Sequence, residues 1–335
     1  MDFKSEFFNL VGKANSIVIT SHTSPDDDSI GSLLSLFQII KQKYPEKKIR
    51  MVQTGEKIDR YSHFKNYELI EFVPDLTNSL GDMDLLIVLD GGGYGRFSKN
   101  PDELKSLAKQ TICIDHHSSP PDTFTLSTID PEAVSTCELI YKIFHSDTNI
   151  TKPIAETILL GILGAPGYFG YVKPSQIEIF DICKQLIQIA DVELQKFRSM
   201  YDTISPNVYK ILQKIIANSI FMETPGWPKF LYSYFEKNGE SDNDISDANL
   251  AFVSIYLRYI SGYTWGFVIS SHSDSTCKMS LRSLPESVKV RDIVEKMGIG
   301  GGHDRAAGGT FKLSNPKECI DKILNWMKEN QPILS

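Results

Sequence analysis

The sequence contains little cysteine, and its cysteines are not grouped into a pattern that binds metal or forms disulfides. Five cysteines are scattered over 335 residues, and no two of them form a Cys-x-x-Cys pair. Because their number is odd and their spacing irregular, a disulfide framework and a structural zinc site are both disfavoured. We expect them to be small buried apolar side chains or inert surface thiols.

Long apolar runs are also absent. No stretch approaches the roughly 20 apolar residues that a membrane-spanning helix needs. The first residues do not follow the basic, apolar and small-residue order of a signal peptide. A hydrophobic content of 41% and a charged content of 23% are ordinary for a soluble globular protein. We therefore expect a cytoplasmic protein without membrane contact, long enough for two domains.

Positive charge is not in excess. The formal net charge is −7, whereas a protein that coats long nucleic acids usually has a basic surface. We therefore expect no binding to long duplexes. Any phosphate should be bound at a confined site, by cations together with a few arginine or histidine side chains.

Short apolar runs alternate with helical patterns in the first half of the chain. The runs are rich in β-branched residues, which favours buried strands. Their alternation with helices predicts an α/β fold with a doubly wound parallel sheet. The predicted strands are 16–20, 48–53, 84–89 and 111–114, and the predicted helices are 30–43, 102–109, 133–144 and 153–163.

Three polar clusters follow strands of this predicted sheet, at residues 22–28, at Asp90 and at residues 115–117. Ligands of such sheets bind beyond the carboxyl ends of the strands, so we expect the clusters to meet at one edge. Taken singly, each cluster could be a solvated turn or a packed histidine. Three of them on one edge favour a cation site.

Aspartate and histidine side chains suit hard or borderline divalent cations. The expected cofactor is therefore Mn²⁺ or Mg²⁺, as one or two ions. Zinc is less favoured because no cysteine is among the candidate ligands. A carboxylate shared by two ions about 3.5–4 Å apart is the arrangement of two-metal phosphoesterases, where bound water becomes acidic enough to react near neutral pH.

The second half of the chain predicts a smaller α/β unit. Residues 175–219 have mostly helical patterns with a break at Pro206, and the polar segment 236–247 is typical of an exposed loop. The predicted strands are 230–235, 265–271 and 277–282, and the predicted helices are 248–259, 289–296 and 316–328.

A glycine-rich segment, residues 298–309, contains the sequence GGGH. Its amides can bind anions, with the help of a helix N-terminus where one follows. Arg282 can bind a phosphate through two parallel hydrogen bonds. Together they predict a phosphate pocket, with a tight structural turn as the alternative.

In combination, these motifs resemble the DHH-family phosphoesterases. H-x-x-P-D-x-D-x-I-G-S at residues 22–32, the Asp90 segment, IDHH at 114–117 and GGGH-x-x-AAGG at 300–309 occur in the family's order. The two-domain form is similar to RecJ-like enzymes. The length is most similar to the oligoribonucleases that also dephosphorylate 3′-phosphoadenosine-5′-phosphate (pAp). The resemblance implies a DHH metal-binding catalytic domain at 1–190, a helical linker at 191–222 and a DHH-associated substrate-binding domain at 223–335.

The resemblance also implies roles for individual residues. One metal ion would be bound by His22, Asp26 and Asp90, and a second by Asp28, Asp90 and His116. The implied catalytic residues are Asp115, His116 and His117, with His117 contacting the scissile phosphate. The implied substrate-binding residues are His117, Arg282, Ser283, Gly301, Gly302 and His303, and Arg96 is a further basic candidate.

One position departs from the family pattern. The family has an aspartate in a segment resembling G-I-x-x-D-T-G-x-F, whereas residues 161–169 read GILGAPGYF, with Ala165 at the aspartate position. Alanine cannot bind a cation, so the second site keeps at most three protein ligands. Asp27 stands where relatives often have glycine. It either restores some of the missing negative charge or is a solvent-facing carboxylate.

The leading hypothesis is a metal-dependent phosphodiesterase or phosphatase that hydrolyses short oligonucleotides, such as linear dinucleotides, or small nucleotides such as pAp. The alternative, motivated by Ala165, is a catalytically weakened nucleotide-binding or regulatory protein. A pyrophosphatase or polyphosphatase on the same N-terminal domain is a third option. The expected partner is the oligonucleotide or nucleotide, and a homodimer is a possible assembly.

Overall fold

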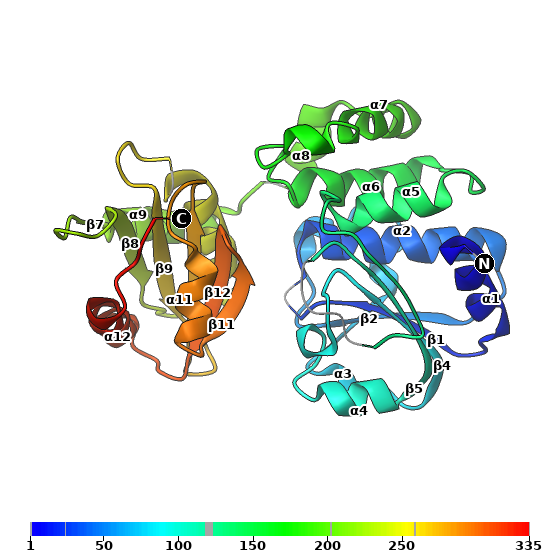
Figure 1. Cartoon of the computed structure of the whole chain (residues 1–335), viewed down its shortest axis with the longest axis horizontal. Helices are drawn as coiled ribbons and strands as arrows, with labels where there is room; N and C mark the ends of the chain where they lie inside the picture. The colour runs from blue at the N-terminus through cyan, green and yellow to red at the C-terminus, as the bar shows by residue number, and fades with distance from the viewer. Residues whose placement is uncertain (1, 24, 118–122, 202, 258, 335) are drawn as a thin grey trace. The chain divides into compact units, whose positions relative to one another are not determined.

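Figure 1 shows the computed structural model, which describes residues 2–23, 25–117, 123–201, 203–257 and 259–334. The chain forms two compact units, Met1–Thr203 and Ile204–Ser335. The division between them falls inside the segment 191–222 that the sequence predicts as a linker.

The first unit contains a six-stranded sheet with the strand order β3-β2-β1-β4-β5-β6. All neighbouring strands run parallel. The predicted parallel sheet is thus confirmed, and β3 and β6 are additional strands at its two edges. The strands are β1 Ile17–Ser21, β2 Ile49–Thr54, β3 Ile70–Val73, β4 Met83–Leu89, β5 Ala108–Asp115 and β6 Leu126–Ile129.

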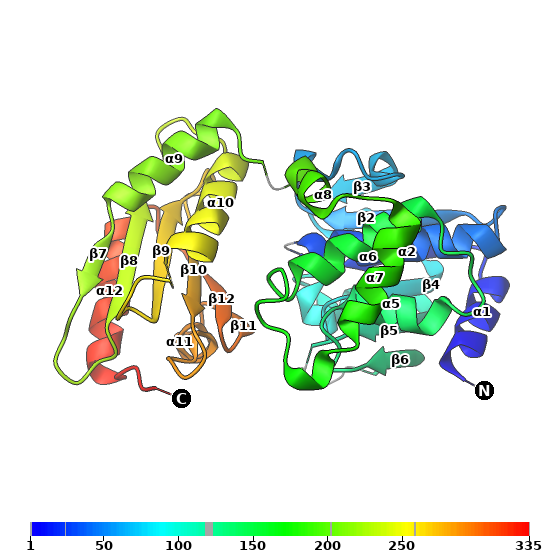
Figure 2. The same cartoon turned by 90° about the horizontal axis from the view of Figure 1, so that it is seen from above.

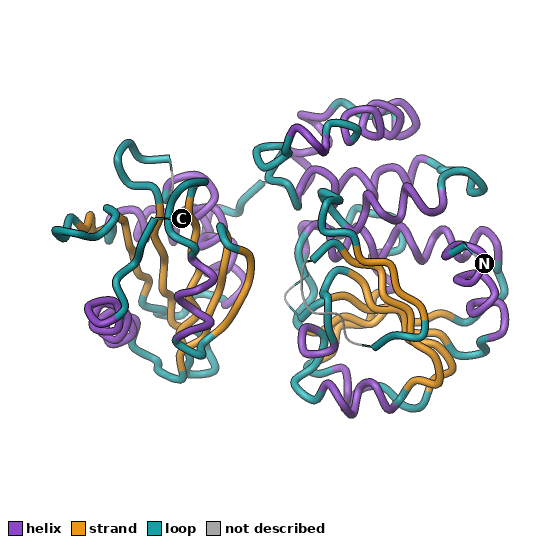
Figure 3. Tube along the Cα trace, in the orientation of Figure 1, coloured by secondary structure: helices purple, strands orange, loops and turns teal. Residues whose placement is uncertain are grey.

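Helices cover both faces of this sheet, as Figure 3 shows. The larger group is α1 Phe3–Lys13, α2 Asp27–Lys43, α5 Thr136–Phe144 and α6 Lys152–Gly164, with α7 Ile179–Ala190 and α8 Leu194–Tyr201 in a further layer outside them (Figure 1). The other face carries α3 Leu76–Ser79 and α4 Pro101–Ser106. Short 3₁₀ turns η1 Asp59–Tyr61, η2 Tyr67–Leu69, η3 Tyr94–Arg96 and η4 Pro174–Gln176 lie in the connections.

The apolar run of β4 explains why helices cover both faces of the sheet. Leu85, Ile87 and Leu89 belong to the core beneath the larger group of helices. Leu86 and Val88 belong to the core beneath α3 and α4. Since successive side chains of a strand point to opposite faces, an uninterrupted apolar strand needs a partner layer on each side.

One predicted helix of this unit ends too late. The helical pattern 102–109 is observed only to Ser106, and β5 begins at Ala108. Ala108 pairs with Met83 of β4, and the Met83 amide donates to the carbonyl of Leu107. Pairing with the sheet therefore decides the conformation of this short segment against its local preference.

The second unit also contains a six-stranded sheet, in the order β11-β12-β10-β9-β8-β7. Only the β8–β9 pair is parallel, and the other pairs are antiparallel. The strands are β7 Ile220–Met222, β8 Phe230–Phe235, β9 Trp265–Ser271, β10 Cys277–Ser283, β11 Gly300–His303 and β12 Ala306–Phe311.

Two groups of helices pack on this second sheet. Val268 of β9 belongs to a core with α9 Pro206–Ala217, α10 Asp242–Ala251 and the π-helical turn η5 Phe252–Tyr256. Phe267 belongs to the opposite core with α11 Val290–Lys296 and α12 Pro316–Glu329. In Figure 2, α10 and α12 lie on opposite sides of the strands.

Two predictions for the second unit are wrong. The segment 236–247 is a loop only as far as Ser241, which caps α10 by accepting a hydrogen bond from the Asp244 amide. The predicted helix 248–259 therefore begins earlier, at Asp242, and its α-helical part ends at Ala251. The segment is polar, and so predicted as a loop, because most side chains of α10 are not buried. Only Ile245, Ala248 and Asn249 of this helix are buried.

The glycine-rich segment is a β-hairpin, not a loop that leads into a helix. Gly300–His303 forms β11, and β12 follows it directly. A Cβ atom at Gly300 would overlap the carbonyl oxygen of Gly308, and one at Gly302 would lie 2.6 Å from that of Ala306. Close approach of the two strands therefore requires glycine at both positions.

A buried histidine makes the stability of the second unit depend on pH. Burial lowers the pKa of His272 from 6.5 to about 4, and the charge of Lys278 adds to this effect. The unfolded chain therefore binds one more proton between these pH values, so the unit loses stability as the pH falls from 6.5 towards 4. Between pH 7.5 and pH 5 we expect His272 to cost about 2 kcal/mol.

Urea titrations followed by tryptophan fluorescence will measure this cost, since all three tryptophans, at 227, 265 and 326, lie in the second unit. The His272→Leu variant should lose this part of the acid-side slope. Parallel pH profiles for the two proteins would contradict the expectation.

Candidate cation site

The three predicted polar clusters meet where the strand order of the first sheet reverses. β1 and β4 are neighbours at the centre of the sheet, and the chain continues outward from them in both directions. His22 follows β1, Asp90 follows β4, and Asp115 is the last residue of β5. Such a reversal leaves a crevice at the carboxyl ends of the strands, where ligands of this fold class bind.

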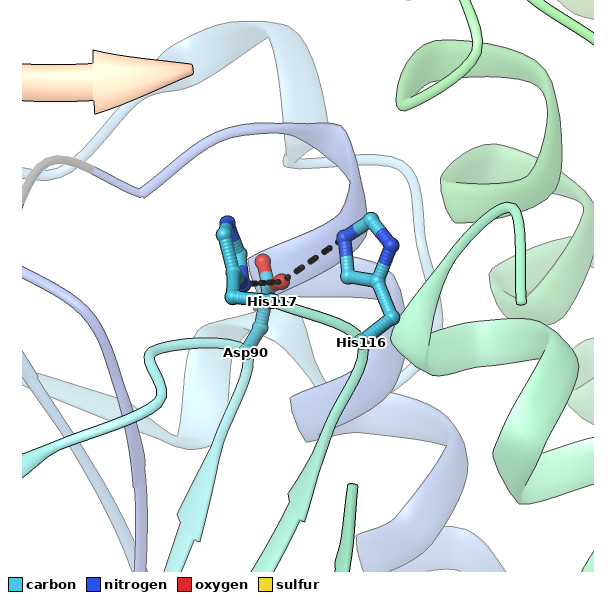
Figure 4. Close-up of side chains that lie close together, drawn as sticks. All are labelled: Asp90, His116 and His117. Atoms are coloured by element: carbon cyan, nitrogen blue, oxygen red, sulfur yellow. Dashed lines mark ion pairs between the residues drawn. The ribbon is translucent and has the colours of Figure 1, made fainter. Parts of the chain in front are cut away.

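Asp90 lies at the centre of the cluster. Its Oδ2 is 3.5 Å from Nε2 of His22. Its Oδ1 is 3.5 Å from Nε2 of His116 and 3.6 Å from Nδ1 of His117, as Figure 4 shows for these three residues. The backbone of Asp90 is left-handed, with φ 59°, a conformation that aspartate tolerates better than most residues. The two carboxylate oxygens therefore face two different groups of ligands.

The histidine pair is oriented by its hydrogen bonds. Nδ1 of His116 lies 3.2 Å from the carbonyl oxygen of Ala133, and Nδ1 of His117 lies 2.7 Å from Oδ1 of Asp115. A carbonyl can only accept, so Nδ1 of His116 carries a proton and Nε2 is the nitrogen available to a cation. The hydrogen bond from His117 holds the pKa of Asp115 below its usual range, although burial opposes this.

Asp26 has two functions. Its Oδ1 accepts hydrogen bonds from the amides of Asp28 and Ser29 and so caps the N-terminus of α2. Its Oδ2 lies 3.8 Å from Nε2 of His22. The helix cap thus holds the second oxygen of Asp26 towards His22. His22, Asp26 and Asp90 each offer one atom to a group within 4.8 Å, the size of a cation site.

Asp28 lies beside a second group of candidate ligands, Asp90, His116 and His117, whose donor atoms also lie within 4.8 Å of one another. Its Oδ2 lies 3.6 Å from Nε2 of His116. The same carboxylate accepts hydrogen bonds from the amides of Thr136 and Cys137, at the N-terminus of α5. Asp28 is 1% exposed. The positive end of α5 therefore stabilises a carboxylate that would otherwise be costly to bury.

Electrostatics favour a bound cation here. Burial raises the pKa of Asp90 well above its usual range, and the neighbouring charges of Asp28 and Asp26 raise it further. Burial also raises the pKa of Asp28, with the charge of Asp26 adding to the shift. Crowded buried carboxylates with two imidazoles form an oxygen and nitrogen donor set that fits Mn²⁺ or Mg²⁺.

Asp27 points to other partners. Its Oδ1 accepts hydrogen bonds from the hydroxyl of Tyr61, at 2.5 Å, and from Nη2 of Arg60, at 3.3 Å. Its side chain is 18% exposed. The solvent-facing reading of Asp27 is therefore wrong, because this carboxylate connects the N-terminus of α2 to the 3₁₀ turn η1.

The Asp27→Asn variant should separate stability from cation binding. Loss of the charge leaves Arg60 without its carboxylate in a partly buried place, so we expect a stability loss of about 1–3 kcal/mol. Mn²⁺ affinity should stay within about twofold, a change of less than ~0.5 kcal/mol. Differential scanning calorimetry and isothermal titration will measure the two quantities.

Asp26→Asn is the matched comparison, since the residue next to Asp27 faces His22. It should lower the affinity for Mn²⁺. A comparable loss of affinity in Asp27→Asn would mean that Asp27 contributes charge to the site.

The segment with the missing aspartate adjoins the site. A Cβ atom at Gly161 would lie 2.5 Å from Oδ1 of Asp28, and one at Gly164 would lie 2.5 Å from Oδ2 of Asp27. Both glycines therefore allow the end of α6 to approach the N-terminus of α2. Ala165 follows directly as the C-cap of α6, and its amide donates to the carbonyl of Gly161.

In the second unit, the register places Arg282, Ala306 and His303 in one row across β10, β12 and β11. Ser283 is only 1% exposed and belongs to the buried face of β10, so its side chain lies on the opposite face of the sheet from that of Arg282. A Cβ atom at Gly301 would meet only Oε1 of Glu295, at 3.8 Å, among the described residues. Gly301 is therefore the more open of the two predicted glycines.

Arg96 lies beside the first motif, since its carbonyl accepts a hydrogen bond from the amide of Thr23.

The sequence did not predict two hydroxyl residues that lie at the site. Ser29 Oγ donates to Oδ2 of Asp90 at 2.9 Å and lies 2.8 Å from Nε2 of His22. Thr136 Oγ1 donates to Oδ1 of Asp90 at 3.3 Å. The Ser in the D-x-D-S motif was the available signal for the first, whereas Thr136 had none.

Comparison with family models agrees with this architecture. Residues 16–162 match the model described as the DHH family, N-terminal domain, and residues 228–329 match the DHHA1 domain. The chain belongs to the DHH family, with one of these domains in each unit. No helix in the described part of the chain is long and apolar enough to cross a membrane.

Two similar proteins are named bifunctional oligoribonuclease and PAP phosphatase NrnA. The one from Mycoplasma genitalium is 24% identical over 327 residues, which cover 97% of each chain. The one from Bacillus subtilis is 25% identical over 314 residues, which cover 92% of this chain and 93% of the relative. An exopolyphosphatase-related protein from Bacteroides fragilis has the same fold, with a TM-score of 0.79 at 22% identity over 98% of this chain and 96% of its own.

Proposed function

We propose that this protein is a metal-dependent phosphoesterase that hydrolyses short oligonucleotides or small nucleotides such as pAp. The observation that carries the proposal is the cluster around Asp90, which combines two buried carboxylates with histidine nitrogens at the reversal of the sheet. The relatives named as oligoribonucleases and PAP phosphatases support this class of substrate.

The proposal assigns the ligands in two groups. His22, Asp26 and Asp90 would hold one cation, and Asp28, Asp90 and His116 a second, with Asp90 in both groups. Such ions, when bound, polarise phosphate oxygens and make a bound water more acidic.

The remaining residues would position the substrate. Asp115 holds Nδ1 of His117, which leaves Nε2 of His117 to contact the scissile phosphate. Arg282 and His303 would bind a further phosphate of the substrate, and the open backbone at Gly301 would allow close approach. Fixed donors of this kind contribute by holding the reacting groups in place.

The test is incubation of the purified chain with Mn²⁺ and either pAp or 5′-phosphorylated dinucleotides, with product measured by chromatography. We expect release of inorganic phosphate from pAp or of mononucleotides from dinucleotides. The control is His116→Ala, which removes a nitrogen that faces Asp90 and Asp28. Equal rates for the two proteins would rule out the proposed activity.

A second candidate function rests on Ala165. With one ligand fewer than the family pattern, the protein could bind nucleotides and hydrolyse them slowly or not at all. Calorimetry with Mn²⁺ and nucleotide would then detect binding without turnover. Pyrophosphate in the same assay covers the polyphosphatase option, and we expect it to be the poorer substrate.

A further inference from the structure

One face of β10 carries a series of polar side chains, next to the part of the sheet that α10 and η5 cover. Cys277, Met279 and Leu281 are buried in the core with α11 and α12, whereas Lys278, Ser280 and Arg282 alternate with them and are partly or fully exposed. Alternate residues of a strand share a face. The three polar residues therefore form a line on the face of the sheet opposite that core.

The register extends this line into rows across the neighbouring strand. Arg282 pairs with Ala306, Ser280 with Gly308, and Lys278 with Thr310 of β12. At about 3.4 Å per residue, the rows lie about 7 Å apart, and Lys278 lies about 14 Å from Arg282 along the strand. A polynucleotide backbone presents phosphates at a comparable repeat, so the outer rows correspond to phosphates two steps apart.

The composition of the rows suits such a chain. Both ends are cationic, and the residues between them and opposite them on β12 are glycine, alanine or carry a small hydroxyl group. On the β9 side the middle row meets Val268, which is buried in the core with α9 and α10. The small residues leave room for a backbone, and the hydroxyls of Ser280 and Thr310 can donate to phosphate or sugar oxygens. Asp274 lies in the adjacent turn, where hydrogen bonds from Thr276 and then the charge of Lys278 lower its pKa, so this carboxylate weakens the contact that Lys278 can make.

We propose that Lys278 is a second phosphate subsite, which binds single-stranded oligonucleotides of three or more nucleotides along the outward face of β10. This inference rests on the proposed function, since it takes Arg282 as the first phosphate contact. Dinucleotides and pAp are too short to reach Lys278. The site thus favours longer substrates by charge, without reading their sequence.

The experiment compares Lys278→Ala with the unchanged chain on 5′-phosphorylated oligoribonucleotides of two to five residues, and on pAp. Binding of a fluorescently labelled pentanucleotide in EDTA is measured by anisotropy at several salt concentrations, so that the result does not depend on hydrolysis. We expect about three- to tenfold weaker pentanucleotide binding and a smaller salt slope, reduced by about 0.7. Dinucleotide and pAp kinetics should not change.

Lys322→Ala is the matched control, because Lys322 is exposed on α12, which packs on the other face of the sheet. Lys278→Arg should restore binding. If the unchanged chain hydrolyses dinucleotides but Lys278→Ala binds the pentanucleotide equally well, the subsite is disproved and the proposed function remains. If no substrate is hydrolysed but pentanucleotide binding depends on Lys278, the subsite remains and the proposed function fails.

Discussion

Replacing Asp90 by asparagine is expected to abolish both hydrolysis and the stabilisation that Mn²⁺ gives, while the metal-free protein becomes more stable. Asp90 faces His22 with one oxygen and the His116–His117 pair with the other, so its charge is shared by both groups of candidate ligands. We expect Mn²⁺ affinity to fall at least about 100-fold, the upper end of what even an indirect partner of a metal contributes.

The opposite effect on the metal-free protein has a separate cause. Asp90 is 1% exposed, and this burial raises its pKa well above the usual range. The negative charges of Asp28 and Asp26 raise the pKa further. Without a cation, this carboxylate is buried among like charges, which is unfavourable. Asparagine removes the charge and also tolerates the left-handed backbone at this position, so the turn itself is kept.

Thermal unfolding of both proteins, with EDTA and with Mn²⁺, measures these effects in one series. Ser29→Ala is a useful control, since it removes a hydroxyl next to Asp90 and leaves the charges in place. A variant that is still stabilised by Mn²⁺ as much as the unchanged chain would show that Asp90 is not a shared ligand.

Introducing aspartate at Ala165 is expected to strengthen binding of a second ion at least about tenfold, which corresponds to about 1.4 kcal/mol. Ala165 lies one helical turn beyond Gly161, whose backbone packs against the carboxylate of Asp28. We expect a carboxylate at this position to add a ligand and a negative charge to the proposed group of Asp28, Asp90 and His116. Hydrolysis at limiting Mn²⁺ should rise in parallel.

Titration calorimetry of the metal-free proteins gives the number of ions and their affinities. Ala165→Asn is the matched control, because it has the same shape without the charge. If the unchanged chain is inactive and Ala165→Asp is active, the protein is a nucleotide-binding member of its family. Identical titrations for all three proteins would mean that position 165 does not reach the second group of ligands.

Much of the first unit could be predicted because its signals are local and agree with each other. The β4 run is apolar without interruption, which indicates a strand buried on both faces, and its end is marked by Asp90 and a run of glycines. The β11–β12 hairpin was harder to predict from the sequence, since its glycines have low strand propensity. Only the pairing of β11 with β12, and of β12 with β10, makes them strands.

The candidate site shows the same limit to what the sequence can predict. The types and spacing of His22, Asp26, Asp90 and His116 were sufficient to predict a cation site at one edge of the sheet. The hydroxyl of Thr136 and the amides of α5 that bind Asp28 were not predictable, because they join segments up to 109 residues apart in the chain.

The three consecutive aspartates illustrate what each level decides. The sequence by itself determined that acidic residues follow a buried strand and lead into a helix, since strand and cap propensities are properties of neighbouring residues. The helix begins at Asp27, three residues earlier than the predicted range 30–43, because Asp26 caps it. The tertiary structure alone decided how they differ. Asp26 caps α2 and faces His22, Asp28 faces α5 and His116, and Asp27 is bound by Tyr61 and Arg60. The physical reason is that a carboxylate's role depends on the donors around it, and those donors come from other parts of the fold.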